Sequence, residues 1–193
     1  SGNEEDDFGT WHIKDMQATK RFLGNFGFNR YREIHSAARL KAPNVDDVAV
    51  FCFECLKKCC MLSKGTDADL VKPLLEAHSR EWGDARDKCA LVLNVSLMEK
   101  KCNIKEKTAK DTIRRLRNLA ELKDIITAAE ARGGSTLKFS PPNVSGSKPV
   151  DGWCSGNDRE LMLSMYRHGL EAGPEQAFAS EECWASVKRD GEG

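Results

Sequence analysis

The chain has 193 residues and a formal net charge of zero, with 31% charged, 40% apolar and 7% aromatic residues. A chain of this length can bury about 70% of the surface that its unfolded form exposes, so it needs no disulfide or metal to fold. The composition excludes a disordered tail, a collagen and a membrane span, because no stretch approaches the roughly 18 uninterrupted apolar residues of a transmembrane helix. Since the chain opens with Ser1-Gly2 rather than Met, we interpret it as a fragment of a longer protein.

The zero net charge conceals an alternation of charge along the chain. Residues 8–41 and residues 99–117 each sum to +5, whereas residues 1–7 sum to −4 and residues 150–193 sum to −5. Two basic segments of this kind are typical of a protein that binds nucleic-acid phosphate. The acidic C-terminal segment is typical of a second partner or of a solubilising tail.

Apolar residues recur at helical spacing, and the alternation typical of strands is hard to find, so we predict an all-α fold. The first predicted helix covers residues 11–26, with Thr10 as its N-cap and Gly27 at its end. Its apolar stripe consists of Ile13, Met16, Phe22 and Phe26.

Two more helices with short turns are predicted next. The second covers residues 29–40 and ends before Pro43, and the third begins after Asn44 and ends before Gly65. The inward residues of the second are Tyr31, Ile34, Ala37 and Ala38. The apolar residues of the third are Val45, Val48, Phe51, Cys52, Cys55, Leu56 and Cys59.

The pattern is ragged between residues 66 and 101, where we predict helices over 68–77 and 82–98. It becomes regular again over residues 105–131, which predicts a helix of about seven turns and roughly 40 Å, long enough to separate two modules. One face of this helix carries Ala109, Ile113, Leu116, Ala120, Ile126 and Ala129.

Gly, Ser and Pro residues concentrate between residues 133 and 152, which predicts a flexible linker. After it, Ser155 and Asp158 match a capping box that begins a helix ending at His168-Gly169. The predicted buried side of that helix consists of Leu161, Met162, Met165 and Tyr166. Shorter helices are predicted over 174–179 and 181–187.

Eight cysteines are too dilute in this chain for a disulfide scaffold, so we infer a reducing compartment. Four of them fall on one face of the third helix: Cys52, Cys55, Cys59 and Cys60. With His35 or Cys89 they could complete a zinc site. One helix cannot easily present four ligands tetrahedrally, however, and unpaired cysteine is among the most buried residue types. We therefore predict that the cluster belongs to the core and that no metal is bound.

Catalytic signals are weak in this sequence. Residues 133–136 lack the Lys of a phosphate-binding loop. The four histidines, which we expect at helix surfaces and helix ends, are scattered: His12, His35, His78 and His168. We predict no catalytic residue and no cofactor in this fragment.

Two segments share an outline, from Trp11 to Gly27 and from Trp153 to Gly169: a Trp, then a helix with large apolar residues, then a Gly. This plan resembles Myb-like SANT modules, and residues 153–169 resemble the opening of a SLIDE module. The likeness is closest to the DNA-binding unit of the chromodomain-helicase-DNA-binding (CHD) family of chromatin remodellers. It implies a SANT-like module over 8–65, connecting helices and a spacer helix over 66–132, a linker over 133–152 and a SLIDE-like module, whose last helix is poorly marked, over 153–193.

The resemblance also implies a function. Family members use this unit to hold the duplex DNA that flanks a nucleosome, mainly through phosphate contacts. We therefore expect a nuclear, monomeric DNA-binding unit without chemistry of its own. The motor that uses ATP and Mg²⁺ would lie outside this chain.

The candidate phosphate-binding residues are the cations of the two basic segments. They are Arg30, Arg32, Arg39, Lys41, Lys100, Lys101, Lys105, Lys107, Lys110, Arg114, Arg115 and Arg117. A run of this kind can also be a solvated helix face held by pairs such as Glu106 with Lys110 and Asp111 with Arg115. Single-strand binding is disfavoured, because the aromatic residues fall where the core should be.

Two other functions stay open at this stage. The helices could form a protein-interaction module that binds histone tails or a remodeller subunit. A Myb-like regulator that reads base sequence would need Asn, Gln or Arg facing outward on its third helix, which instead offers cysteines and the pair Lys57 and Lys58.

Overall fold

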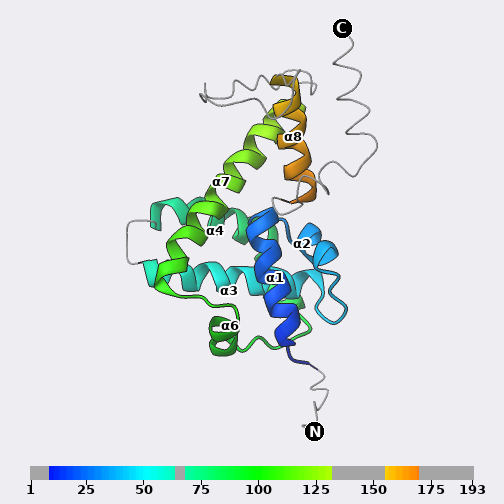
Figure 1. Ribbon diagram of the computed structural model, residues 1–193. Coiled ribbons are helices and arrows are strands. Elements are labelled where there is room, and N and C mark those ends of the chain that lie inside the picture. The colour runs from blue at the N-terminus through cyan, green and yellow to red at the C-terminus, as the bar shows by residue number, and fades with distance from the viewer. Residues whose placement is uncertain (1–8, 64–67, 132–154, 170–193) are drawn as a thin grey trace. The chain divides into compact units, whose positions relative to one another are not determined.

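The computed structural model describes residues 9–63, 68–131 and 155–169. These residues form α-helices without any strand, which confirms the all-α prediction (Figure 1). The helices are α1 (Ile13–Phe26), α2 (Tyr31–Ala38), α3 (Val45–Ser63), α4 (Ala68–Trp82), α5 (Ala85–Lys88), α6 (Val95–Lys101), α7 (Glu106–Ala131) and α8 (Ser155–His168). Within the described ranges, no helix is both long and apolar enough to cross a membrane.

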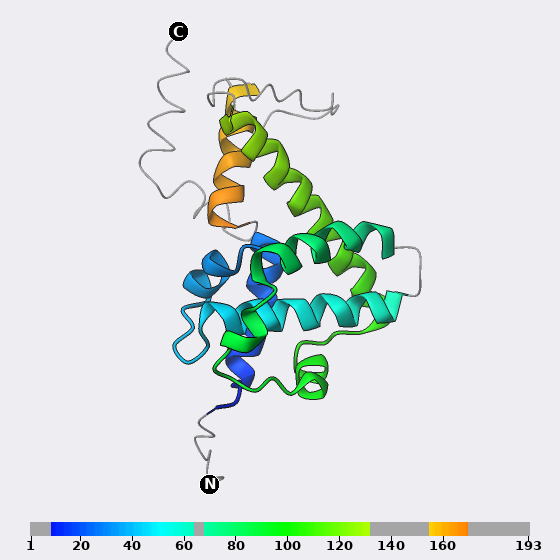
Figure 2. The ribbon, with the colours of Figure 1, turned by 180° about the vertical axis from the view of Figure 1, so that it is seen from behind.

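The chain divides into two compact units, residues 1–120 and residues 121–193, and the division falls inside α7. Helices of the predicted SANT-like module and of the predicted connecting segment therefore belong to the same unit. Within it, α3 is the central helix, because α1, α2, α4, α5 and α6 all contact it. Figure 2 shows the same helices from behind, with α3 and α4 side by side.

Helix α3 is central because apolar residues occupy much of its circumference. The prediction for its inward residues is confirmed, apart from Val45, which is half-buried. Large fully buried side chains of this unit come from α1, α2, α3, α4, α6 and α7: Met16, Leu23, Tyr31, Ile34, Phe51, Leu56, Val71, Met98, Ile113 and Leu116. One core therefore joins helices that are far apart in the sequence.

Helix α1 begins two residues later than predicted, and its buried face agrees with the prediction only in part, at Met16 and Phe26. Its N-cap is His12, and Thr10 instead forms an isolated parallel bridge with Val92. Ile13, predicted to be inward, is 39% exposed. The buried stripe consists of Met16, Thr19, Leu23 and Phe26, which follow helical spacing more closely than the predicted set does.

The predicted helix over residues 82–98 is wrong, because its middle is an extended segment. Helix α4 continues to Trp82, the four-residue α5 follows, and residues 89–94 lead to α6. The Val92 N–H donates to the Gly9 carbonyl at 2.7 Å, and the Asn94 side chain caps α6. These contacts satisfy the backbone of the segment without helical hydrogen bonds, which sequence periodicity alone does not reveal.

The cysteine cluster lies in the core, as predicted for three of its four members. Cys52, Cys55 and Cys59 are fully buried, while Cys60 is half-buried. Burial raises the pKa of the Cys52 thiol. A hydrogen bond from Cys55 lowers the pKa of the Cys59 thiol, despite its burial.

His78 is the histidine that departs from the sequence prediction, because it is buried rather than at a surface or helix end. Its Nδ1 lies 2.8 Å from the Tyr31 hydroxyl, which also donates to Asn29 Oδ1 at 3.1 Å. The hydrogen bond between Tyr31 and His78 thus ties α2 to α4 inside the core. The ring also stacks on Phe53, with centroids 4.8 Å apart. Burial lowers the pKa of His78.

This burial predicts an acid-sensitive contribution to stability. Below the unfolded-state pKa of about 6.5, the unfolded chain takes up a proton that the folded chain resists, so stability falls as the pH drops toward the lowered folded pKa. We expect the unfolding free energy of the wild type, relative to that of His78→Gln, to fall between pH 6.5 and pH 5 by at most about 1.4 kcal/mol per pH unit. Urea titrations at each pH measure it. Parallel pH curves for the two proteins would contradict the prediction.

In the second unit, α8 begins at Ser155 and ends at His168, as predicted. Gly169 adopts φ 91° and donates its N–H to the Met165 carbonyl, an end that favours glycine. The predicted buried side is only half-buried, and Ser164 is the buried residue of the last turns. The predicted linker over 133–152, Trp153 and the helices predicted over 174–179 and 181–187 lie outside the described residues.

Candidate nucleic-acid interface

Helices α1 and α7 lie side by side and run in the same direction. Gln17 Nε2 donates to the carbonyl of Lys101, the last residue of α6, and Lys20 Nζ lies 3.5 Å from Thr112 Oγ1 of α7. One turn further on, Arg115 donates to the Gly24 carbonyl. A Cβ at Gly27 would lie 2.9 Å from Leu119 Cβ, so the glycine permits this close approach. Helix α1 therefore covers the flank of α7 that carries Thr112, Arg115 and Leu119.

The opposite flank of α7 carries four exposed cations, which we call the α7 basic stripe. They are Lys107, Lys110, Arg114 and Arg117. Their spacing of i, i+3, i+7 and i+10 places them on one side of the helix, over a length of about 15 Å. The buried face of Ala109, Ile113 and Leu116 anchors the helix beneath them. The stripe is thus a row of positive charge on a rigid element.

Within the stripe, Arg114 has an ion pair with an acidic neighbour, Asp111. Both side chains are largely exposed, at 72% and 67%. Exposed pairs of this kind contribute about 0–1 kcal/mol, so a phosphate can replace the carboxylate at little cost. The predicted pair of Asp111 with Arg115 is wrong, and the described part of the chain shows no pair between Glu106 and Lys110.

Two candidate residues have structural roles instead. Arg30 is only 7% exposed, donates to Glu33 Oε1 at 3.1 Å and lies over the Phe26 ring. Arg115 is exposed to solvent. Its guanidinium nevertheless donates to the Gly24 carbonyl and to Asn25 Oδ1, and so it joins α7 to α1. Their guanidinium groups hold helices together rather than project toward a ligand.

The other candidates lie at the surface of the first unit. Lys100 and Lys101 are exposed in the last turn of α6, and Lys105 is exposed in the turn before α7. Arg32, Arg39 and Lys41 are exposed on α2 and the turn after it, where Arg39 adopts a left-handed φ of 52°. The structure therefore brings four of the five α7 candidates into one row, preceded in the chain by those of α6 and the turn after it, and it places Arg115 against α1.

Sequence reasoning missed two exposed cations of α1, Lys14 and Arg21. They are seven residues apart and so share one side of α1. The Arg21 guanidinium lies 4.6 Å from the centroid of the Phe22 ring. The charge of +5 over residues 8–41 was the available signal, because these two residues contribute to it.

The aromatic side chains that we expected in the core are buried only in part. Trp11 and Phe26 are buried, while Phe22 and Tyr166 are half-buried. Across the described ranges, no three or more His, Cys, Asp and Glu side chains are grouped so that they could hold a metal ion.

Comparison with known proteins finds no matching family model, no matching curated protein and no matching solved structure.

Proposed function

We propose that this chain binds duplex DNA through its phosphates, as the DNA-holding part of a chromatin remodeller of the kind it resembles. The observation that carries the proposal is the α7 basic stripe, which aligns four exposed cations on one flank of a helix that is anchored by its buried face. Lys and Arg that neutralise phosphates supply most of the affinity of such proteins without reading sequence. Under this proposal the chain is a binding unit, and the ATP-dependent motor and the nucleosome are its functional context in the nucleus.

The geometry favours phosphate contacts over base contacts. The stripe extends about 15 Å along a straight helix, enough to meet several successive phosphates. Its members are Lys and Arg, and Arg114 and Arg117 can each donate two parallel hydrogen bonds to one phosphate. Lys100, Lys101 and Lys105 are exposed just before the helix and can add further contacts.

A gel-shift titration with a random-sequence 30-base-pair duplex, over salt concentrations from 50 to 200 mM, tests the proposal. We expect sequence-tolerant binding with a slope of about −4 to −5 for log affinity against log salt, since each neutralised phosphate contributes about −0.9. An unrelated duplex of equal length should bind equally well. No binding at 50 mM salt, or a strong preference for one sequence, would refute it.

A further inference from the structure

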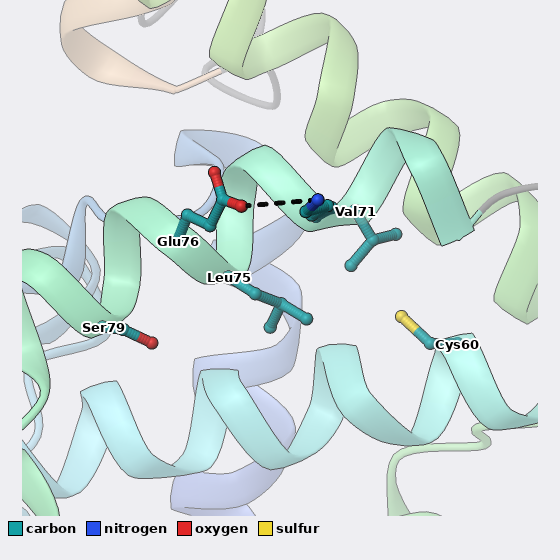
Figure 3. Close-up of a pocket in the computed structure, with 6 residues that line it drawn as sticks. Cys60, Val71, Leu75, Glu76 and Ser79 are labelled. Atoms are coloured by element: carbon teal, nitrogen blue, oxygen red, sulfur yellow. Dashed lines mark ion pairs between the residues drawn. The ribbon is translucent and has the colours of Figure 1, made fainter.

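The α3–α4 pair forms a hairpin with a hollow along its seam. A cavity of about 440 Å³ opens where the end of α3 faces the start of α4 (Figure 3). Its walls consist of Cys60, Val71, Lys72, Leu75, Glu76 and Ser79. Figure 3 shows Val71 and Leu75 descending from α4 and Cys60 rising from α3 toward the same space.

A second cavity, of about 310 Å³, continues along the same seam. Val50, Phe53 and Lys57 of α3 line it, as do His78 and Trp82 of α4. Ser79 lines both cavities, so we treat them as one feature, the α3–α4 groove. From Val50 to Cys60 the groove follows α3 for about 15 Å, which matches nearly three turns of a helix.

Apolar side chains line the groove although it is open to solvent: the first cavity is almost wholly apolar, whereas Glu54, Lys57 and Arg86 add charged groups to the second. Five side chains along it are only half-buried: Val50, Phe53, Cys60, Leu75 and Trp82. Met61 lies four residues after Lys57, on the same side of α3, and is 66% exposed. A half-buried apolar row of this length, extended by an exposed Met, is typical of an interaction site, and the flexible Met61 side chain suits it to a helical partner.

The charges on the rim of the groove are unequal. The Glu54 carboxylate is shared by two cations, Arg86 and Lys57, and its distance to Lys57 Nζ is 3.8 Å. On α4, Lys72 Nζ lies 4.0 Å from Glu76 Oε1, and its side chain is 75% exposed. One carboxylate cannot balance two cations, so Glu54 leaves one positive charge in excess, while the Lys72–Glu76 pair is balanced. Both lysines reach solvent. The rim therefore favours acidic groups on whatever covers the apolar floor.

We propose that the α3–α4 groove binds an amphipathic helix of a partner protein that carries acidic residues beside its apolar face. A straight groove between two antiparallel helices accepts a third helix with apolar anchors at i, i+3 or i+4, and i+7. The apolar floor receives the anchors, and Lys57 and Lys72 pair with the flanking carboxylates. This activity is independent of DNA binding, because the groove residues belong to α3, α4 and the turn through α5 rather than to the α7 basic stripe.

Selection from a displayed library of random 16-residue helical peptides tests this proposal. The whole chain is the bait, and peptides that also bind the Leu75→Glu variant are removed. We expect the enriched peptides to have apolar residues at helical spacing and Asp or Glu beside them. The best of them should bind the Lys57→Glu, Lys72→Glu double variant at least ten-fold more weakly.

Circular dichroism checks that the Leu75→Glu variant folds. The double variant changes only exposed side chains, so it still tests the groove if the Leu75→Glu variant does not fold. Failure to enrich peptides that depend on Leu75, or enrichment of basic ones, overturns the proposal. Sedimentation of the free protein tests the other possible occupant of the groove, which is a second copy of this chain. A dimer that the Leu75→Glu change dissociates would show that a second copy fills the groove, which also overturns it.

Discussion

Replacement of the α7 basic stripe by alanine, at Lys107, Lys110, Arg114 and Arg117, is expected to weaken duplex DNA binding on the order of 100-fold at about 100 mM salt. Up to four phosphate contacts disappear, so the slope of log affinity against log salt should flatten by as much as about 3.6. The loss should be equal for all duplex sequences, since phosphates carry no sequence information. Fluorescence anisotropy with a labelled duplex over several salt concentrations measures both quantities.

A matched control removes the same charge from other surfaces of the same unit. Lys57, Lys72, Arg80 and Lys88 are exposed and lie on α3, α4 and α5. Their joint replacement by alanine should leave the salt slope within about one unit of the wild-type value, because none belongs to the stripe. If the two quadruple variants lose affinity and slope alike, the DNA responds to total charge and the stripe has no special role.

Arg115 has a structural role, although its neighbour Arg114 on the same helix belongs to the α7 basic stripe. Its guanidinium donates to the Gly24 carbonyl and to Asn25 Oδ1, so it fastens α7 to α1. Charge counting along the sequence cannot distinguish it from Arg114, because the two residues are adjacent. Only the angular position on the helix and the location of α1 assign one to the surface row and the other to the helix contact.

The features that depend on local pattern were predictable. Helix α7 differs from its predicted range by one residue at its start, and the ends of α8 agree with the prediction, since caps and periodicity are local signals. Of the predicted face of α7, Ala109, Ile113 and Leu116 are fully buried. The cysteine face of α3 was predictable for the same reason.

The features that depend on distant contacts were not predictable. His78 is buried because Tyr31 and Phe53 reach it from other helices. The extended segment at residues 89–94 is another case, because its hydrogen-bond partners come from residues more than forty positions earlier. A local pattern carries no information about such partners.

Asp47 supplies most of those distant hydrogen bonds, although its side chain is 1% exposed. Its Oδ1 accepts the backbone N–H groups of Ala90 and Leu91, both at 2.8 Å, and its Oδ2 accepts the Asn44 N–H at 2.7 Å. In return the Asn44 side chain accepts the Asp47 N–H at 2.8 Å. One carboxylate therefore caps α3 and holds the extended segment against it.

Asp47→Ala is expected to lower the free energy of unfolding by about 3–5 kcal/mol, because it removes the acceptor of three backbone N–H groups in a buried site. Asp47→Asn should cost less, about 2 kcal/mol, since its amide keeps one acceptor oxygen but directs a donor at an N–H. Urea denaturation measures both changes, and hydrogen exchange should show faster exchange at the Ala90 and Leu91 amides.

The neighbouring Asp46→Ala loses only a favourable charge in the first turn of α3 and should cost less than about 1 kcal/mol. Equal losses for Asp46→Ala and Asp47→Ala would mean that the carboxylate acts only through the helix terminus and does not hold the extended segment.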